Sequence, residues 1–176
     1  MIKYTDFTYF FYRLSINCLL FLLLFFLINF EKSLGYFSIF NSSTPSIISI
    51  LIYLLIRKLN FSPSNILLFI LGILNDVMSG VSLGFSSMFF LLIKFQAENL
   101  SLLKLNNNHE QQWFSFTFIF ITTFFIVFLI NVTVNLNIPD LNPLLFHVGT
   151  TLILFPIINS GLDLIFFITR MIKTNS

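Results

Sequence analysis

One carboxylate lies inside an otherwise apolar run of this chain, Asp76 within residues 72–84. A carboxylate at the centre of a bilayer costs about 2.5–3.5 kcal/mol, so such a group commonly handles a proton, an ion or a ligand. The structural alternative is that Asp76 braces a glycine-rich turn by accepting hydrogen bonds from backbone N–H groups. Because no second acid lies nearby in the apolar sequence to complete a proton relay, the bracing role is favoured.

Small residues surround this acid at a regular interval, because Gly72, Asp76, Gly80 and Gly84 recur every four positions. On one helix these positions share a face, and small residues there let a neighbouring backbone approach closely. Alternatively, Gly80 ends the helix and forms a tight turn between two apolar segments. Both interpretations predict a close-packed corner.

Two further patterns could indicate catalysis or metal binding. Ser82 between Gly80 and Gly84 matches the G-x-S-x-G pattern, but a nucleophile elbow needs a strand, a turn and a helix, and no sheet is predicted here. His147 could meet Asp76 and hold a proton or a metal. A histidine satisfied by a backbone carbonyl is the commoner arrangement, and two histidines without ligand spacing predict no metal site.

Asp163 lies near the end of the last apolar segment, where it could pair with Arg170 or with a cation of a neighbouring segment. The alternative is a partner-binding acid within the bundle. Cys18 is the only cysteine, so it forms no intramolecular disulfide and is expected to act as a small apolar side chain. The sequence thus predicts no catalytic, cofactor-binding or metal-ligating residues.

The composition indicates whether the chain is surrounded by water or by a membrane. Of the 176 residues, 57% are hydrophobic and 9% are charged, and the mean hydropathy is +0.94. A soluble domain carries roughly 25% charged residues, so this chain cannot coat a water-facing surface. A formal net charge of +2 without any basic run argues against binding nucleic acid. An integral membrane protein remains.

Six apolar segments predict an all-α fold, a six-helix transmembrane bundle forming a single domain over residues 1–176. The first segment resembles a signal peptide, but the many apolar segments after it favour a membrane span. Pro156 is expected to kink the last helix rather than end it. The predicted spans cover residues 14–30, 45–56, 64–79, 83–95, 113–134 and 144–169.

The basic residues predict the orientation of this bundle. With six spans, eight of the nine cations lie on the side of both termini, and only Lys32 lies on the other side. The positive-inside rule therefore places both termini in the cytoplasm. These cations either set the topology alone or also contact anionic lipid head groups and cytoplasmic partners. The eight are Lys3, Arg13, Arg57, Lys58, Lys94, Lys104, Arg170 and Lys173.

The pattern G-x-x-x-D-x-x-x-G-x-x-x-G over residues 72–84 resembles that of the rod shape-determining protein MreD family, as do the length and hydropathy of the chain. Asn75 stands where that family commonly has a hydrophobic residue. Further family-like positions are Pro45 opening the second span, Tyr53 and Arg57 towards its end, and Pro156 and Arg170 in the last span.

The resemblance implies a non-enzymatic scaffold of the bacterial elongasome, in the inner (cytoplasmic) membrane, that regulates cell shape and lateral peptidoglycan synthesis. The partners it implies are an MreC-like protein, the actin-like MreB, RodZ, and the glycosyltransferase RodA with its transpeptidase partner, besides membrane lipids. It implies no cofactor, and a fold similar to the substrate-binding subunits of energy-coupling-factor transporters. The structural or partner-binding candidates are Gly72, Asp76, Gly80, Gly84, Arg57, Pro45, Tyr53 and Pro156.

Two other functions stay open. A substrate-capture subunit of an energy-coupling-factor vitamin transporter would need a small-molecule pocket open to the outside and a partner with an ATPase. A small membrane enzyme would need converging ionisable residues, and only Asp76 and His147 could converge.

Overall fold

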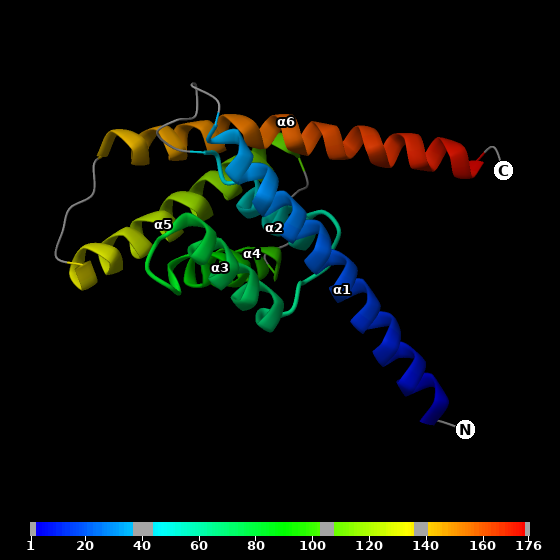
Figure 1. Ribbon diagram of the computed structural model, residues 1–176. Helices are drawn as coiled ribbons and strands as arrows, with labels where there is room; N and C mark the ends of the chain where they lie inside the picture. Colours follow the sequence, from blue (N-terminus) through cyan, green and yellow to red (C-terminus); the bar gives the residue numbers. More distant parts are fainter. Residues whose placement is uncertain (1–2, 37–43, 103–107, 136–140, 175–176) are drawn as a thin grey trace.

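The computed structural model describes the backbone of residues 3–36, 44–102, 108–135 and 141–174, and the side chains of 15–36, 44–100, 108–134 and 141–164. Over these residues the chain is all-helical, which confirms the all-α part of the predicted fold (Figure 1). The described helices are α1 (Lys3–Leu34), α2 (Ile47–Arg57), α3 (Asn65–Ser79), α4 (Phe85–Leu102), α5 (His109–Asn135) and α6 (Leu141–Thr174).

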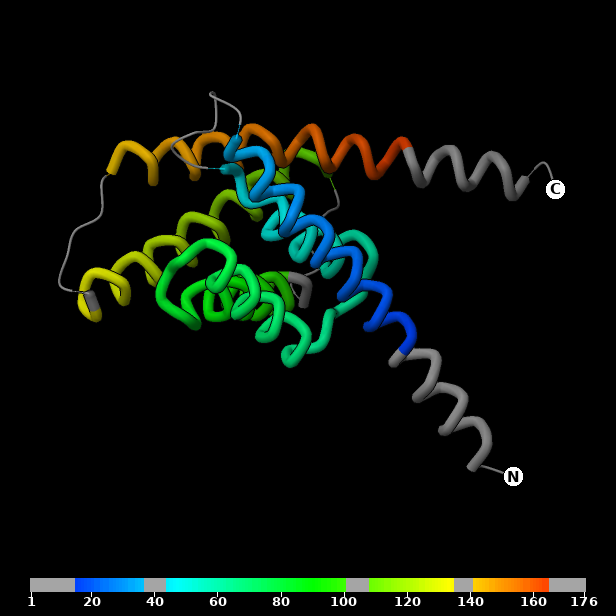
Figure 2. Tube along the Cα trace, in the orientation of Figure 1, coloured from blue at the N-terminus to red at the C-terminus, as the bar shows by residue number. Residues whose placement is uncertain are grey.

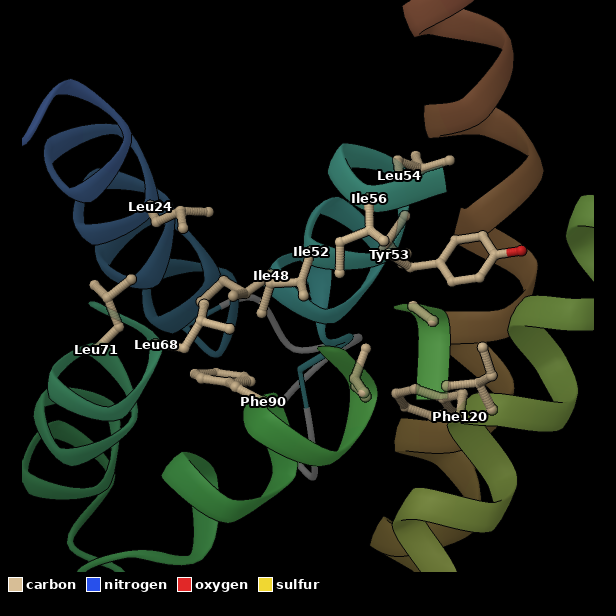
Figure 3. Packing of buried hydrophobic residues seen from close by; sticks show 14 of the residues in the cluster. Leu24, Ile48, Ile52, Tyr53, Leu54, Ile56, Leu68, Leu71, Phe90 and Phe120 are labelled. Atoms are coloured by element: carbon tan, nitrogen blue, oxygen red, sulfur yellow. The ribbon is translucent and has the colours of Figure 1, made fainter. Parts of the chain in front are cut away.

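The short helix α2 lies at the centre of the fold. It packs against α1, α4, α5 and α6, and α3 and α4 form a closely packed hairpin beside it. Its residues Ile48, Ile50, Ile52 and Leu54 are all buried. Figure 3 shows Tyr53 pointing towards α6 and Ile48 lying on the opposite side, towards α3. A helix that is apolar all round is a core helix.

Aromatic rings fill the space between α2, α5 and α6. The ring of Tyr53 lies 5.3 Å from that of Phe116 and 5.7 Å from that of Phe155, in edge-to-face geometry. Phe116 and Phe155 stack with their centroids 4.5 Å apart. Such pairs stabilise a core beyond the area they bury, so these rings fix the spacing of the three helices.

The outer surface is apolar too. On α1 the buried residues Leu20, Leu24 and Ile28 form one stripe, whereas Leu19 and Phe26 on the other faces are 68% and 71% exposed. A large exposed apolar surface is unfavourable in water and favourable among lipid chains. Within the part of the chain that the structure describes, three helices are long and apolar enough to cross a membrane, over Ser15–Leu34, His109–Val134 and Leu141–Leu164. The chain is therefore a membrane protein.

The helix bounds differ from the predicted segments at several places. α4 continues to Leu102, past the predicted end at residue 95, and α5 begins at His109, ahead of residue 113. α6 runs through Pro156 without ending, as predicted. With 11 residues, α2 is about 16 Å long, half of a hydrocarbon core of about 30 Å. α2 is thus a buried central helix shorter than a full spanning helix.

Candidate functional site

The turn between α3 and α4 depends on two glycines. Gly80 follows the last residue of α3 with φ 65° and ψ 24°, the left-handed conformation that ends many helices. Gly84 precedes α4 with φ 103°. A side chain at either position would meet open space, so the two glycines are required for their backbone conformation and not for close packing.

Asp76 holds this turn from inside the helix pair. Its side chain is 1% exposed, and its Oδ2 accepts a hydrogen bond from the backbone N–H of Gly84 at 2.7 Å. Its Oδ1 accepts a second one from the backbone N–H of Ser86 at 3.0 Å. The first N–H groups of a helix lack intrahelical partners, so Asp76 caps α4 from the end of α3. This is the bracing arrangement.

Gly72 lets α3 and α4 come into backbone contact. A Cβ atom on Gly72 would lie 2.2 Å from the Cα of Ser87, far inside van der Waals contact. At the same level the Ser87 hydroxyl donates to the carbonyl of Phe69 at 2.8 Å. The corner is therefore close-packed as predicted. The prediction of one shared helix face is wrong for Gly80 and Gly84, which lie in the turn, and the alternative of a tight turn is the one observed.

A second polar cluster joins the end of α2 to the second half of α6 and to the start of α5. The Lys58 Nζ lies 2.5 Å from Asp163 Oδ1 and donates to Asn159 Oδ1 at 2.8 Å. His109 Nε2 lies 3.3 Å from Asp163 Oδ2. Asp163 thus pairs with a cation of a neighbouring segment, and the side chain of Arg170 lies outside the described residues. Lys58 and Asp163 are more than 100 positions apart, so no local sequence pattern predicts their contact.

The other predicted positions lie away from Asp76. Tyr53 donates its hydroxyl to the Gln112 carbonyl at 3.1 Å. Arg57 is half-buried near Tyr53. Pro45 is buried just before α2, and Pro156 lies exposed on α6. These side chains do not gather into one site with the α3–α4 corner.

His147 meets a backbone carbonyl. Its Nδ1 lies 2.5 Å from the oxygen of Thr44, and its ring lies 6.2 Å from the rings of Phe120 and Phe124. Among the residues that the structure describes, no hydrogen bond or ion pair joins it to Asp76. The described part of the chain also holds no group of three or more His, Cys, Asp or Glu that could bind a metal ion.

A cavity of about 520 Å³ opens beside the α3–α4 corner. Its wall includes Glu31 and Lys32 of α1, Asn75 of α3, and His147 of α6. Of these four residues, only His147 was considered from the sequence as a candidate for chemistry, and the cavity itself was not predicted. The Glu31-Lys32 pair marks the end of the first apolar segment in the sequence, but its inward orientation requires the packed bundle.

Comparisons with protein-family models, with curated proteins and with solved structures found no match to this chain. The likeness to the MreD family therefore rests on the sequence pattern alone.

Proposed function

We propose that this protein is a non-enzymatic scaffold of the bacterial inner membrane that organises the cell-shape machinery, as the MreD-like sequence pattern implies. In this proposal the chain crosses the membrane six times with both termini in the cytoplasm. The short helix α2 crosses together with its flanking segments. The scaffold would bind an MreC-like protein and, directly or through it, MreB, RodZ, and RodA with its transpeptidase partner.

The observation that carries the proposal is how the buried polar groups are used. Asp76 joins α3 to α4, and Lys58 joins α2 to α6 through Asp163. Lys94 of α4 donates to the Pro63 carbonyl ahead of α3 at 2.7 Å. Each of these ionisable groups connects two helices, which is the use expected in a protein whose function is to present a fixed surface.

The apolar outer faces offer the surface that a scaffold needs. Large side chains project outward along α1, α5 and α6, among them Phe26, Phe118 and Ile153, at 71%, 64% and 69% exposure. Inside a bilayer, helices associate by van der Waals packing and hydrogen bonds. The single span of a partner such as an MreC-like protein could pack along these faces without any change in the bundle.

The described cations support the proposed orientation. Arg57 and Lys58 close α2, and Lys94 lies in the second half of α4, so all three belong to one end of an up-and-down bundle. Lys32 at the end of α1 lies at the opposite end. The positive-inside rule assigns the richer end to the cytoplasm.

The test is affinity purification of the tagged full chain from native membranes in mild detergent, with companions quantified by mass spectrometry against the bait. We expect MreC-like and wall-synthesis proteins, reduced by Gly80→Leu and by Asp76→Leu at equal bait recovery. Glu110→Gln is the control, because Glu110 is an exposed polar side chain in the first turn of α5 and belongs neither to the α3–α4 corner nor to the apolar outer faces. Failure to recover these proteins with the wild-type chain would refute the scaffold role.

The cavity beside the α3–α4 corner favours a second function, the capture of a small molecule for an energy-coupling-factor vitamin transporter. Its volume of about 520 Å³ lies within the range of small-molecule sites, roughly 300–1,000 Å³. In the proposed orientation it lies at the extracytoplasmic end. The same purification separates the two functions, because a transporter subunit would bring an ATPase pair and a coupling membrane subunit instead.

A further inference from the structure

The cavity of about 520 Å³ lies where three helices end and three begin. Its wall takes residues from the ends of α1, α3 and α5 and from the starts of α2, α4 and α6. Figure 2 shows the α3–α4 turn, the end of α5 and the start of α6 on the same side of the molecule. The ends of helices that cross a membrane lie near the lipid head groups, so a cavity at these helix ends is expected to be accessible to lipids.

Two hydrogen-bond acceptors on this wall lack donors. Glu31 is 6% exposed, and its Oε2 is buried without a hydrogen-bond partner, while the backbone N–H groups of Ile47 and Ile48 interact with the same carboxyl group. Asn75 donates its amide to Ser86, yet its Oδ1 is also buried and unpartnered. Buried polar atoms are normally satisfied, so these acceptors indicate a ligand with N–H donors.

A cation lines the same cavity. Lys32 donates from its Nζ to the Ser79 hydroxyl at 2.5 Å, which holds its side chain across from α1 to the end of α3. A lysine ammonium carries three donors and is a common phosphate ligand. A wall that carries Glu31 and Lys32 is complementary to a zwitterion with an ammonium group at one end and a phosphate at the other.

An apolar groove continues the cavity towards the lipid. A second hollow of about 330 Å³ between α5 and α6 shares Phe124, Phe128 and Leu144 with the polar cavity. It then runs along Leu145, which is 69% exposed, so the groove opens on the outside of the bundle. A polar cavity joined to an apolar groove fits an amphiphile better than a wholly water-soluble molecule.

We propose that this site binds a phospholipid with a primary ammonium head group, of the phosphatidylethanolamine type. The ammonium donates to Glu31 and Asn75, the phosphate accepts from Lys32, and one acyl chain lies in the groove along Phe124 and Phe128. The proposal needs only the membrane location of the protein, so it stands or fails separately from the scaffold role.

The first experiment compares lipids on the delipidated full-length protein in mild detergent, with thermal unfolding and native mass spectrometry as measurements. Phosphatidylethanolamine should raise the unfolding temperature more than phosphatidylcholine, whose quaternary ammonium has no N–H donor, and more than phosphatidylglycerol, which has no cation. Free phosphoethanolamine tests whether the head group alone is enough for binding. It should stabilise the protein much less than phosphatidylethanolamine does. Equal stabilisation by phosphatidylethanolamine and phosphatidylcholine would overturn the proposal, as would a soluble head group as effective as the lipid.

The second experiment removes the charge of Glu31. Loss of a hydrogen bond between charged groups weakens binding by about tenfold or more. Glu31→Gln should therefore abolish most of the preference for phosphatidylethanolamine. Glu110→Gln, at an exposed carboxyl group in the first turn of α5, is the matched control and should keep it. Leu145 lines the apolar groove and not the polar cavity. Leu145→Ala should therefore weaken lipid binding without changing the response to free phosphoethanolamine. If Glu31→Gln fails to fold, the wild-type lipid comparison still decides, and a folded Glu31→Gln with unchanged preference refutes the site.

Discussion

The carboxylate of Asp76 holds the backbone N–H of Gly84 at 2.7 Å, across the turn that joins α3 to α4. A helix cap normally comes from the residue just before the helix, whereas this one comes from the preceding helix. The negative charge faces the first N–H groups of α4, where the helix dipole favours an anion. Glu31 of α1 stands in a similar relation to Ile47 and Ile48 at the start of α2. Asp76 is thus tolerated in apolar sequence because the backbone N–H groups at the start of α4 receive its carboxylate.

The first prediction concerns the loss of this cap. Asp76→Ala leaves the N–H groups of Gly84 and Ser86 without their acceptor in a buried corner, and should lower the free energy of unfolding by about 2–4 kcal/mol. Asp76→Asn keeps one acceptor oxygen and should cost less. The measurement is unfolding by denaturing-detergent titration, followed by circular dichroism.

Glu110→Ala is the control for this series, because Glu110 is exposed at the other end of the bundle. It should leave the free energy of unfolding unchanged. An Asp76→Ala protein as stable as wild type would mean that the observed hydrogen bonds contribute nothing to the corner.

The second prediction concerns the close approach at Gly72. Gly72→Ala forces a Cβ against the backbone of Ser87, and overpacking of this kind costs about 1–3 kcal/mol or more. Gly149→Ala is the matched control, because it also changes a helical glycine, but at a position where the Cβ meets open space. It should be neutral or stabilising by up to about 1 kcal/mol, since alanine favours helix. Equal effects of the two substitutions would contradict the packing.

The third prediction separates backbone conformation from packing. Gly80 has open space around it but a φ of 65°, so Gly80→Ala should cost about 1–2 kcal/mol through left-handed strain alone. Gly80→Asn should cost less, because asparagine tolerates this conformation. If Gly80→Ala were more stable than Gly80→Asn, the left-handed backbone conformation would not be what position 80 requires.

The sequence predicted the helical class, the close-packed corner and the continuation of the last helix through Pro156, because each follows from local pattern. It left open whether Gly72, Gly80 and Gly84 share one helix face or whether Gly80 ends the helix in a turn. The four-residue interval suits one helix face, but the positive φ of Gly80 and Gly84 places them in a turn. That distinction depends on where α3 ends, which spacing alone leaves open.

Local sequence patterns also do not predict contacts between distant segments. Lys58 and Asp163 are more than 100 positions apart, and each alone is a plausible interfacial charge. Likewise, Glu31 and Asn75 share a cavity wall only because α1 and α3 end at the same end of the bundle. Their unpartnered oxygens become visible when the packing is known, and no residue pattern marks them beforehand.

The fourth prediction concerns the ion pair that joins α2 to α6. In a double-mutant cycle of Lys58→Met and Asp163→Asn, measured by detergent titration, the two changes should couple by about 1 kcal/mol. The size is moderate because the Asp163 side chain is 39% exposed, while that of Lys58 is 13% exposed. His109→Ala should couple more weakly to Asp163→Asn, because His109 is exposed and its Nε2 lies 3.3 Å from the Asp163 carboxylate. Additive effects of Lys58→Met and Asp163→Asn would mean that the pair does not hold the helices together.

The fifth prediction tests whether α4 crosses the membrane. At 18 residues it is about 27 Å long, close to the thickness of a hydrocarbon core, and the six-span proposal places its two ends on opposite sides. In a background with Cys18→Ala, Ser82→Cys reports on the α3–α4 turn, and Asn108→Cys reports on the segment just before α5. Both native side chains are exposed. An impermeant maleimide should label Ser82→Cys in intact spheroplasts and label Asn108→Cys only after permeabilisation. Labelling of both sites from the same side would mean that α4 is not a spanning helix, and would overturn the six-span topology.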